Sequence, residues 1–366
     1  MTGLAKRQAP ASLPGGWGRR PGAGRLGRGP ALALGGLMLV LALVAGSATG
    51  AYAIAPGRLP SLLWEAATGN GAGGPEHLVF FGIRLPRLLL GVATGAGLGL
   101  AGALMQGLFR NPLADPVLIG VSSGAALAAA LSIVLGSRWF PALPHVMGSW
   151  TLIAMAFAGG LMVTSLVYAL GQASGGTRMG LMLLAGVAVN ALAGAGLGFL
   201  SFISTDEQLR NLQMWLLGSL GAARWSAVAL VGVAVAASLA MGLALARPLN
   251  AIALGEAQAS LLGVAVERTK RRAVLVAALA VGAVTATTGV IGFIGLVAPH
   301  WVRIVAGPDH RVVLPGSALL GGSLVVTADA VARTVVKPAE LPLGVLTAFI
   351  GVPLFLLMLR QFRNKV

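Results

Sequence analysis

The chain has 366 residues, of which 57% are hydrophobic and only 10% are charged. Soluble domains carry about 25% charged residues, so this chain has too little polar surface to cover a globule in water. The composition therefore excludes a water-soluble fold and predicts a protein that crosses a membrane several times.

The net formal charge is +16, and the sequence contains no cysteine. A basic balance occurs in nucleic-acid-binding proteins, but it also occurs in membrane proteins whose cytoplasmic loops are rich in Lys and Arg. The lack of cysteine excludes disulfides, thiolate metal sites and covalently attached haem. The placement of the basic residues, given below, favours the membrane explanation, and no nucleic-acid partner is expected.

The first residues, 1–29, are rich in Gly, Pro and Arg, and we expect them to form a disordered basic cytoplasmic tail. The apolar run that follows resembles a secretory signal, because it ends on small residues. It is longer than a typical signal core and further spans follow it. We therefore interpret it as a retained first membrane helix within one transmembrane domain, 30–366.

Apolar runs of about 20 residues, the length that crosses a bilayer as a helix, recur along the chain. They predict an all-α polytopic membrane protein with ten spans. The eighth run is too short to cross alone, so we expect a broken or re-entrant helix that protein must bury. The predicted spans are 31–54, 86–109, 117–136, 150–170, 180–203, 225–246, 273–292, 294–306, 315–335 and 342–360.

Two polar segments between the spans have local explanations. The segment Ser204–Leu220 has the pattern of a short amphipathic helix at the surface. Between the second and third spans, Pro112 and Pro116 stop helix continuation, and Asp115 is placed to cap the third helix. These residues predict a stiff turn, and their polarity alone indicates nothing more specific.

The basic residues predict the orientation of the chain. With the N-terminus inside, 18 Lys and Arg residues fall on the cytoplasmic side and eight on the outer side. Cytoplasmic loops collect Lys and Arg, so this bias predicts that both termini lie in the cytoplasm.

An internal repeat is visible at an offset of 187 residues. The segments Gly102–Pro112 and Gly289–Pro299 share their first glycine, their last proline and apolar residues between, and Arg84 and Arg271 correspond at the head of each unit. Five spans between equivalent points would invert one unit relative to the other, as is common in transporters. Gly and Ala are very frequent in this chain, so a chance match between the two segments is the alternative to a true repeat.

The sequence shows no energy source of its own. Only one acidic residue, Asp329, lies inside a predicted span, and Arg333 one helical turn later can neutralise it. None of the four lysines follows a glycine, as a phosphate-binding P-loop would require. No nucleophile–base or metal cluster is recognisable either. We therefore expect neither a catalytic nor a metal site on this chain, and a channel or ion-coupled secondary carrier remains a remote alternative.

Several long segments resemble a known family. The stretch "MQGLFRNPLADPVLIG" within Arg84–Ala129 is similar to the signature of permease subunits in ABC importers for iron-siderophores, haem and cobalamin. The likeness continues, in family order, through Arg247–Val264, Gly292–Gly316, Ala328–Thr334 and Glu340–Leu359. It implies a homodimer of ten-helix subunits in the bacterial inner membrane that works by alternating access.

The resemblance also implies partners and site residues. Two separate ATPase subunits would hold ATP-Mg inside, one periplasmic binding protein would dock outside, and no cofactor would be bound permanently. The positions of Arg84, Arg87 and Arg333 match those that receive carboxylates from the binding protein, with snorkelling at the lipid interface as the alternative. The segment 247–272 matches the loop that couples to the ATPase, with a merely solvated loop as the alternative. Its residues predict two short helices broken by glycines, with Glu256 near a helix start. The matching coupling residues are Leu254, Gly255, Glu256, Leu262 and Gly263.

Two further expectations concern the transport pathway and its substrate. The loop residues Gly175, Gly176 and Thr177 are candidates for a cytoplasmic gate, although a plain flexible loop fits equally well. The residues of the signature segment resemble those of haem permeases most. Haem is therefore the expected substrate, and a ferric siderophore or cobalamin is the alternative. His300 and His310 are candidate haem contacts, but a structural or coupling role suits their motifs better.

Overall fold

The computed structural model describes residues 25–50, 52, 54–68, 74–139, 149–336 and 339–363. The predicted tail, 1–29, therefore lies mostly outside the described residues. Within the described ranges nearly every residue is helical, and one pair of two-residue strands is the sole β-structure.

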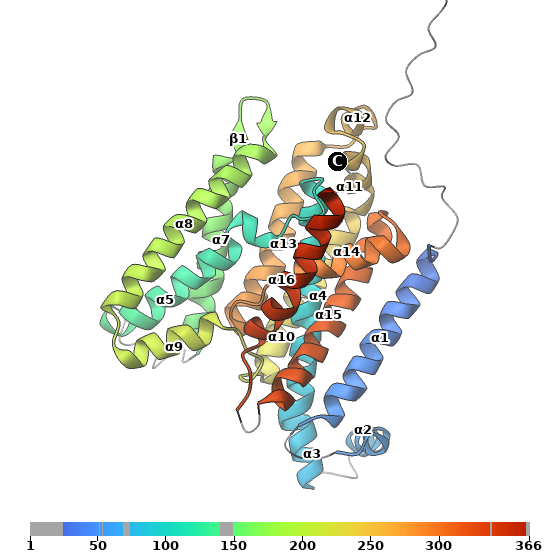
Figure 1. Ribbon diagram of the computed structural model, residues 1–366, viewed down its shortest axis with the longest axis vertical. Coiled ribbons are helices and arrows are strands. Elements are labelled where there is room, and N and C mark those ends of the chain that lie inside the picture. Colours follow the sequence, from blue (N-terminus) through green and yellow to red (C-terminus); the bar gives the residue numbers. More distant parts are fainter. Residues whose placement is uncertain are drawn as a thin grey trace, which may run out of the picture.

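Ten helices correspond to the ten predicted spans, which confirms the all-α multispan fold (Figure 1). In the described part of the chain, eight helices are long and apolar enough to cross a membrane, and α5 and α14 are shorter apolar helices. The ten are α1 (Arg28–Ala48), α4 (Leu85–Leu108), α5 (Val121–Trp139), α7 (Trp150–Leu170), α8 (Met179–Ile203), α10 (Trp225–Ala244), α13 (Val266–Thr288), α14 (Ile294–Ala306), α15 (His310–Val335) and α16 (Leu343–Arg363).

Helix α4 lies at the centre of the bundle, with α15, α13, α14 and α10 packed around it. In the most apolar stretch of the continuous helix Pro75–Leu108, 78% of the residues are buried. Glycines bring its backbone against its neighbours: a Cβ added at Gly95 would lie 2.0 Å from the Gly321 oxygen, and one at Gly102 would lie 1.7 Å from the Gly295 oxygen. Small residues of this kind let helices approach closely in lipid, where no hydrophobic effect drives them together.

A wide turn precedes α4 in an otherwise continuous helix. The short helix α3 (Pro75–Val79) leads through a π-helical turn, Phe80–Arg84, directly into α4. Pro86 has no N–H to donate, and its ring would clash with the carbonyl group four residues earlier. Widening the turn relieves both problems, as π-bulges do elsewhere.

The two segments that indicated a repeat are in contact. Besides the close approach of Gly102 to Gly295, the Gln106 side chain donates from Nε2 to the Leu296 carbonyl at 3.2 Å. Helices α4 and α13, which the repeat makes equivalent, pack side by side, and both are mostly buried. The inversion of one unit relative to the other stays a prediction.

The polar elbow between α4 and α5 forms as expected, with one difference. Asp115 accepts a hydrogen bond from the Val117 N–H at 2.9 Å, so it does act as an N-cap. It caps a 3-10 turn, Pro116–Ile119, and α5 begins only after Gly120. Burial raises the pKa of the Asp115 carboxyl, and the hydrogen bond from Val117 opposes that shift.

The predicted surface helix is present as α9 (Asp206–Leu216), which lies at the edge of the bundle, below α5 and α8 in the view of Figure 1. Its N-terminus carries a reciprocal capping box between Thr205 and Gln208. Leu212 is its one buried residue, so α9 uses a narrow apolar stripe and leaves its charged residues exposed.

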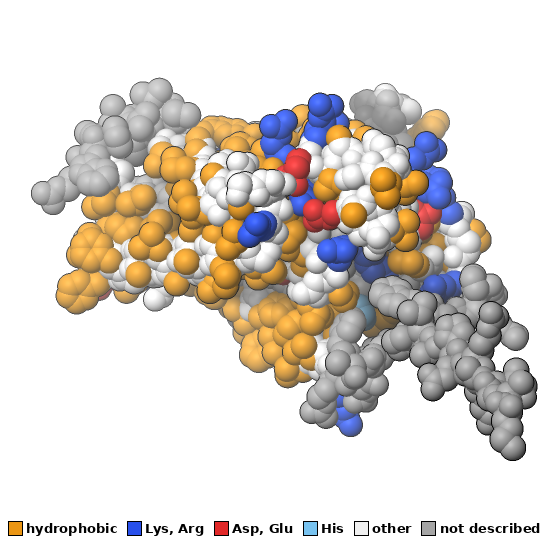
Figure 2. Space-filling view, turned by 90° about the horizontal axis from the view of Figure 1, so that it is seen from above, with side chains coloured by type: hydrophobic (Ala, Val, Ile, Leu, Met, Phe, Trp, Pro, Cys, Tyr) orange, Lys and Arg blue, Asp and Glu red, His pale blue; other side chains and the backbone are white. Residues whose placement is uncertain are grey.

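The bundle has two distinct ends (Figure 1). At the α12 end lie the short helices α11 (Ala246–Ala253) and α12 (Glu256–Leu261), the start of α1 and the end of α16. At the opposite α3 end lie α3 and α2 (Leu59–Thr68). Figure 2 looks onto the α12 end and shows Lys and Arg side chains gathered there beside a few acidic ones.

Candidate functional site

The predicted coupling segment, 247–272, folds as α11, α12 and the first turns of α13. The break between α11 and α12 depends on Gly255, whose φ of +126° is rarely adopted by residues with a side chain. The expectation of two short helices separated by a glycine is confirmed, and Glu256 begins α12 as the sequence suggested.

Leucine side chains project from this segment into solvent. Leu254 is 69% exposed, Leu261 89% and Leu262 66%. Apolar side chains that are exposed together mark a surface that contacts another protein, a ligand or a membrane. Sequence matching singled out Leu254 and Leu262 but missed Leu261, although the neighbouring leucines in "ASLLG" were the available signal.

Lys270 is buried at the base of this segment and was not singled out from the sequence. The residue is 1% exposed, and its ammonium donates to the Thr177 carbonyl at 2.9 Å, to Glu256 Oε2 at 2.7 Å and to Glu267 Oε1 at 2.9 Å. An ammonium has three donors, so these acceptors satisfy it completely. One side chain thereby joins the loop before α8, helix α12 and helix α13.

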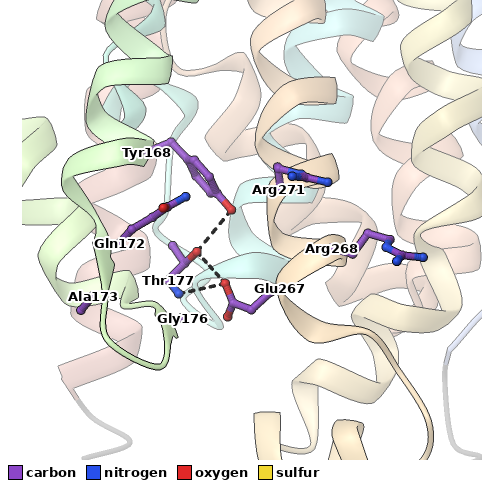
Figure 3. Close-up of a pocket in the computed structure, with 8 residues that line it drawn as sticks. All are labelled: Tyr168, Gln172, Ala173, Gly176, Thr177, Glu267, Arg268 and Arg271. Carbon is purple, nitrogen blue, oxygen red and sulfur yellow. Dashed lines mark hydrogen bonds between the residues drawn. The ribbon is translucent and has the colours of Figure 1, made fainter.

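The predicted gate loop folds as a hairpin between α7 and α8. Strand β1 (Gln172–Ala173) pairs antiparallel with β2 (Gly176–Thr177). The Thr177 N–H and hydroxyl both donate to Glu267 Oε2, at 2.8 and 2.7 Å, which fastens the hairpin to the start of α13 (Figure 3). Gly175 and Gly176 both have positive φ at the turn. The gating role itself stays a prediction.

A cavity of about 300 Å³ lies between the hairpin and α13 (Figure 3). It is polar on the α13 side, where Arg268 and Arg271 flank Glu267. Its other lining residues are Tyr168, Gln172, Ala173, Gly176 and Thr177.

A second polar cluster ties α11 to the start of α15. Asn250 donates from Nδ2 to Asp309 Oδ1 at 2.7 Å and accepts from the His310 N–H at 2.9 Å. The His310 ring is buried, with Nδ1 2.7 Å from Asn250 Oδ1 and Nε2 facing Gly107, where an added Cβ would lie 2.4 Å away. This buried position suits the structural role considered for His310 and offers no open face to haem, while His300 is half-buried.

At the α3 end, an ion-pair cluster joins α4 to α15 and the loop before α16. Arg87 Nη2 lies 2.8 Å from Asp329 Oδ1 and 2.9 Å from Glu340 Oε2, and Arg333 Nε lies 3.0 Å from Asp329 Oδ2. The predicted Asp329–Arg333 pair is confirmed. The hydrogen bonds from Arg87 hold the pKa of the Glu340 carboxyl below its usual range, so this exposed partner stays ionised at neutral pH.

The structure places Arg84 differently from the sequence expectation of a surface arginine. Its side chain is buried and donates to the main-chain carbonyls of Ser47, at 2.5 Å, and of Tyr52. Arg333 donates likewise to the carbonyl of Thr49 at 2.9 Å. Basic side chains commonly satisfy the free carbonyls at a helix C-terminus. In this conformation Arg84 therefore satisfies main-chain carbonyls at and just after the end of α1, and its side chain is not exposed to a docking protein.

The model of the FecCD transport family matches residues 37–361. The chain belongs to the FecCD transport family. It is 44% identical over 339 residues to the hemin transport system permease protein HmuU of Yersinia pestis, covering 92% of this chain and 98% of that one. It is 43% identical over 320 residues to the cobalamin import system permease protein BtuC of Halobacterium salinarum, covering 86% and 83%.

A solved structure has the same fold. It is a metal-chelate type ABC transporter in an inward-facing conformation, with a TM-score of 0.77 and 30% identity, covering 91% of this chain and 99% of that one. Together these matches confirm the resemblance found in the sequence, and they identify the chain as an importer permease subunit of the FecCD family. The family match extends over both polar clusters, at the α12 end and at the α3 end.

Proposed function

We propose that this FecCD-family permease imports haem, receiving it from a periplasmic binding protein and releasing it into the cytoplasm. The supporting observation is the likeness to a hemin permease at 44% identity over 98% of that protein's length. A cobalamin permease is almost as similar, at 43% identity over 83% of its length. Cobalamin and ferric siderophores are therefore the second candidates.

The test of the substrate is a direct comparison. The permease would be reconstituted in proteoliposomes with its ATPase and its binding protein, and haem, a ferric siderophore and cobalamin would be offered separately. We expect haem alone to stimulate ATP hydrolysis and to accumulate inside. If cobalamin or the siderophore were taken up and haem were not, the haem proposal would be refuted and the family assignment would still hold.

The proposed setting is the bacterial inner membrane, with the α12 end in the cytoplasm and the α3 end in the periplasm. Both described ends of the chain lie at the α12 end, as an even number of crossings requires (Figure 1). The gathering of Lys and Arg on that end supports the cytoplasmic assignment, because basic residues are retained inside (Figure 2).

The proposed assembly is a homodimer served by two separate ATPase subunits, which bind ATP-Mg. The α11–α12 pair would insert into a groove on each ATPase, burying the exposed leucines. ATP binding would draw the ATPase subunits together and displace α12, and the membrane helices would then switch between outward and inward access. This chain supplies the pathway and its coupling surface, with no cofactor held permanently.

Charge placed on the coupling leucines should weaken ATPase binding strongly. We expect Leu261→Glu to weaken association at least about 30-fold, because buried anchors at protein interfaces contribute about 2 kcal/mol or more. Leu261 is 89% exposed, so the change leaves the permease fold intact. Gly255→Arg should act in the same direction, but it also strains a positive-φ position. Co-purification of the ATPase is the measurement.

The matched control is Gly180→Arg. Gly180 follows the hairpin, near the start of α8, and has open space around it. It should retain the ATPase. If Leu261→Glu and Gly255→Arg both co-purified with normal amounts of ATPase, the coupling assignment would be wrong.

At the α3 end, we propose that carboxylates of the binding protein exchange with Glu340 for Arg87. The side chain of Glu340 is 47% exposed, whereas that of Arg87 is 11% exposed, so an incoming acid can reach Arg87 only by displacing Glu340. Glu340→Gln should therefore strengthen docking, and Arg87→Gln should weaken it. Affinity of the binding protein for permease in nanodiscs is the measurement. Opposite signs are required, since a purely structural role would weaken docking in both variants.

A further inference from the structure

Lys270 is the point at which three functional segments meet. Its ammonium holds the carboxylate of Glu256 on the coupling helix α12, the carboxylate of Glu267 on α13 and the carbonyl of Thr177 on the hairpin. In addition, Glu267 accepts two hydrogen bonds from Thr177, and the Thr177 hydroxyl lies 3.3 Å from the Tyr168 hydroxyl at the end of α7. The network is thus continuous from α12 to the hairpin.

The exposures within this network are unequal. The side chain of Lys270 is 2% exposed, while those of Glu256 and Glu267 are 42% and 48% exposed. The two acids can exchange a protein partner for water, but the buried ammonium cannot. Removing one acceptor would leave one N–H of the buried ammonium without a partner, which is more costly than breaking an exposed ion pair. Moving α12 alone would incur this cost, which favours a displacement in which Lys270 and the Thr177 strand move together with α12.

We propose that Lys270 is a positioning residue that transmits the displacement of the coupling helix α12 to the β1–β2 hairpin. The inference rests on the proposed roles of α11–α12 as the ATPase contact and of the hairpin as the cytoplasmic gate. It adds the physical link between the two, which neither segment provides alone. Helix α13, which carries the lysine and runs through the centre of the subunit, extends the same connection into the membrane.

A purely structural lysine would behave differently. It would lower the stability of the permease when replaced, and the protein that still folded would respond normally to ATP. A transmitting lysine leaves ATPase assembly and hydrolysis in place and uncouples them from the hairpin. The discriminating readout is therefore the response of the hairpin to nucleotide, measured separately from stability.

The cysteine-free sequence makes this readout direct. Ser174, exposed at the hairpin tip, would be replaced by cysteine as the single thiol of the chain. The rate of maleimide labelling would be measured in the reconstituted complex without nucleotide and with ATP-Mg plus vanadate. We expect the parent rate to change by at least about fivefold, the lower end of typical coupling between sites.

In Lys270→Met, the nucleotide effect on labelling and on uptake should disappear, while ATPase co-purification and basal hydrolysis remain. The double variant Lys270→Met/Glu267→Gln also removes the charge freed on α13, so it should fold even if the single variant does not, and it should be equally uncoupled. Arg272→Met is the matched control, because Arg272 is an exposed cation on the same helix, and it should respond like the parent.

The outcomes separate the inference from the proposals beneath it. A parent complex without ATPase association would refute the proposed function, and the inference would fall with it. A parent that takes up substrate without any change at Ser174, or a folded Lys270→Met variant that keeps the parent's nucleotide response, would overturn the inference alone.

Discussion

Replacing Asp329 by alanine should destabilise the permease by about 3–5 kcal/mol, because the change leaves buried arginines without their shared carboxylate. The Asp329 side chain is 4% exposed and pairs with both Arg87 and Arg333, whose side chains are 11% and 9% exposed. Arg87 keeps Glu340 as a partner, so most of the lost stability comes from Arg333, which is left without a carboxylate. The expected result is a large drop in melting temperature of the detergent-solubilised protein.

The comparison variant for Asp329→Ala is Glu65→Ala. Glu65 belongs to an ion pair with Arg58 at the same end of the molecule, at 3.6 Å, but the two side chains are 31% and 50% exposed. Exposed pairs contribute about 0–1 kcal/mol, so this variant should melt close to the parent. Similar melting temperatures for the two variants would show that the α3-end cluster does not stabilise the fold.

Adding a single methyl group at Gly102 should lower the stability of the permease almost as much as Asp329→Ala does. A Cβ there would lie 1.7 Å from the Gly295 carbonyl oxygen, so α4 and α14 would have to separate. Overpacking of a tight core costs about 1–3 kcal/mol and occasionally more, and a clash with backbone falls at the upper end because no side chain can move aside. Gly102→Ala should therefore reduce the folded yield and lower the melting temperature.

Gly232→Ala in α10 is the matched control for this prediction, since no neighbouring atom lies within 4 Å of the added Cβ. Alanine favours helix over glycine by about 0.5–1 kcal/mol, so this variant should be neutral or slightly more stable. If Gly102→Ala melted like Gly232→Ala, the close contact between α4 and α14 would be refuted.

Much of the fold was predictable, because its dominant signals are local. Apolar runs marked all ten helices, and the short run before Gly307 correctly indicated the reduced length of α14. Asp115 as a cap, α9 as an amphipathic helix and the glycine break between α11 and α12 also followed from short-range chemistry. The ion pair of Asp329 and Arg333 could be predicted for the same reason, since side chains four positions apart on a helix lie next to each other.

The remaining features depend on contacts that no local pattern encodes. Arg87 meets Asp329 across 242 positions of sequence, and Lys270 meets Thr177 across 93. Arg84 was expected at the surface because its position matches one that receives a carboxylate from the binding protein in the resembling family. The π-helical turn before Pro86 and the free carbonyls at the end of α1 bring it inside instead.

The glycine contacts at the centre of the bundle also determine which motions the subunit can make. Helices that touch through side chains can slide past one another by small rotamer changes, which is the basis of shear. Between Gly95 and Gly321, and between Gly102 and Gly295, no side chain is present to adapt. We therefore expect helices α4, α14 and α15 to turn as one rigid unit, with bending confined to the connections around them, so that the subunit moves as a hinge.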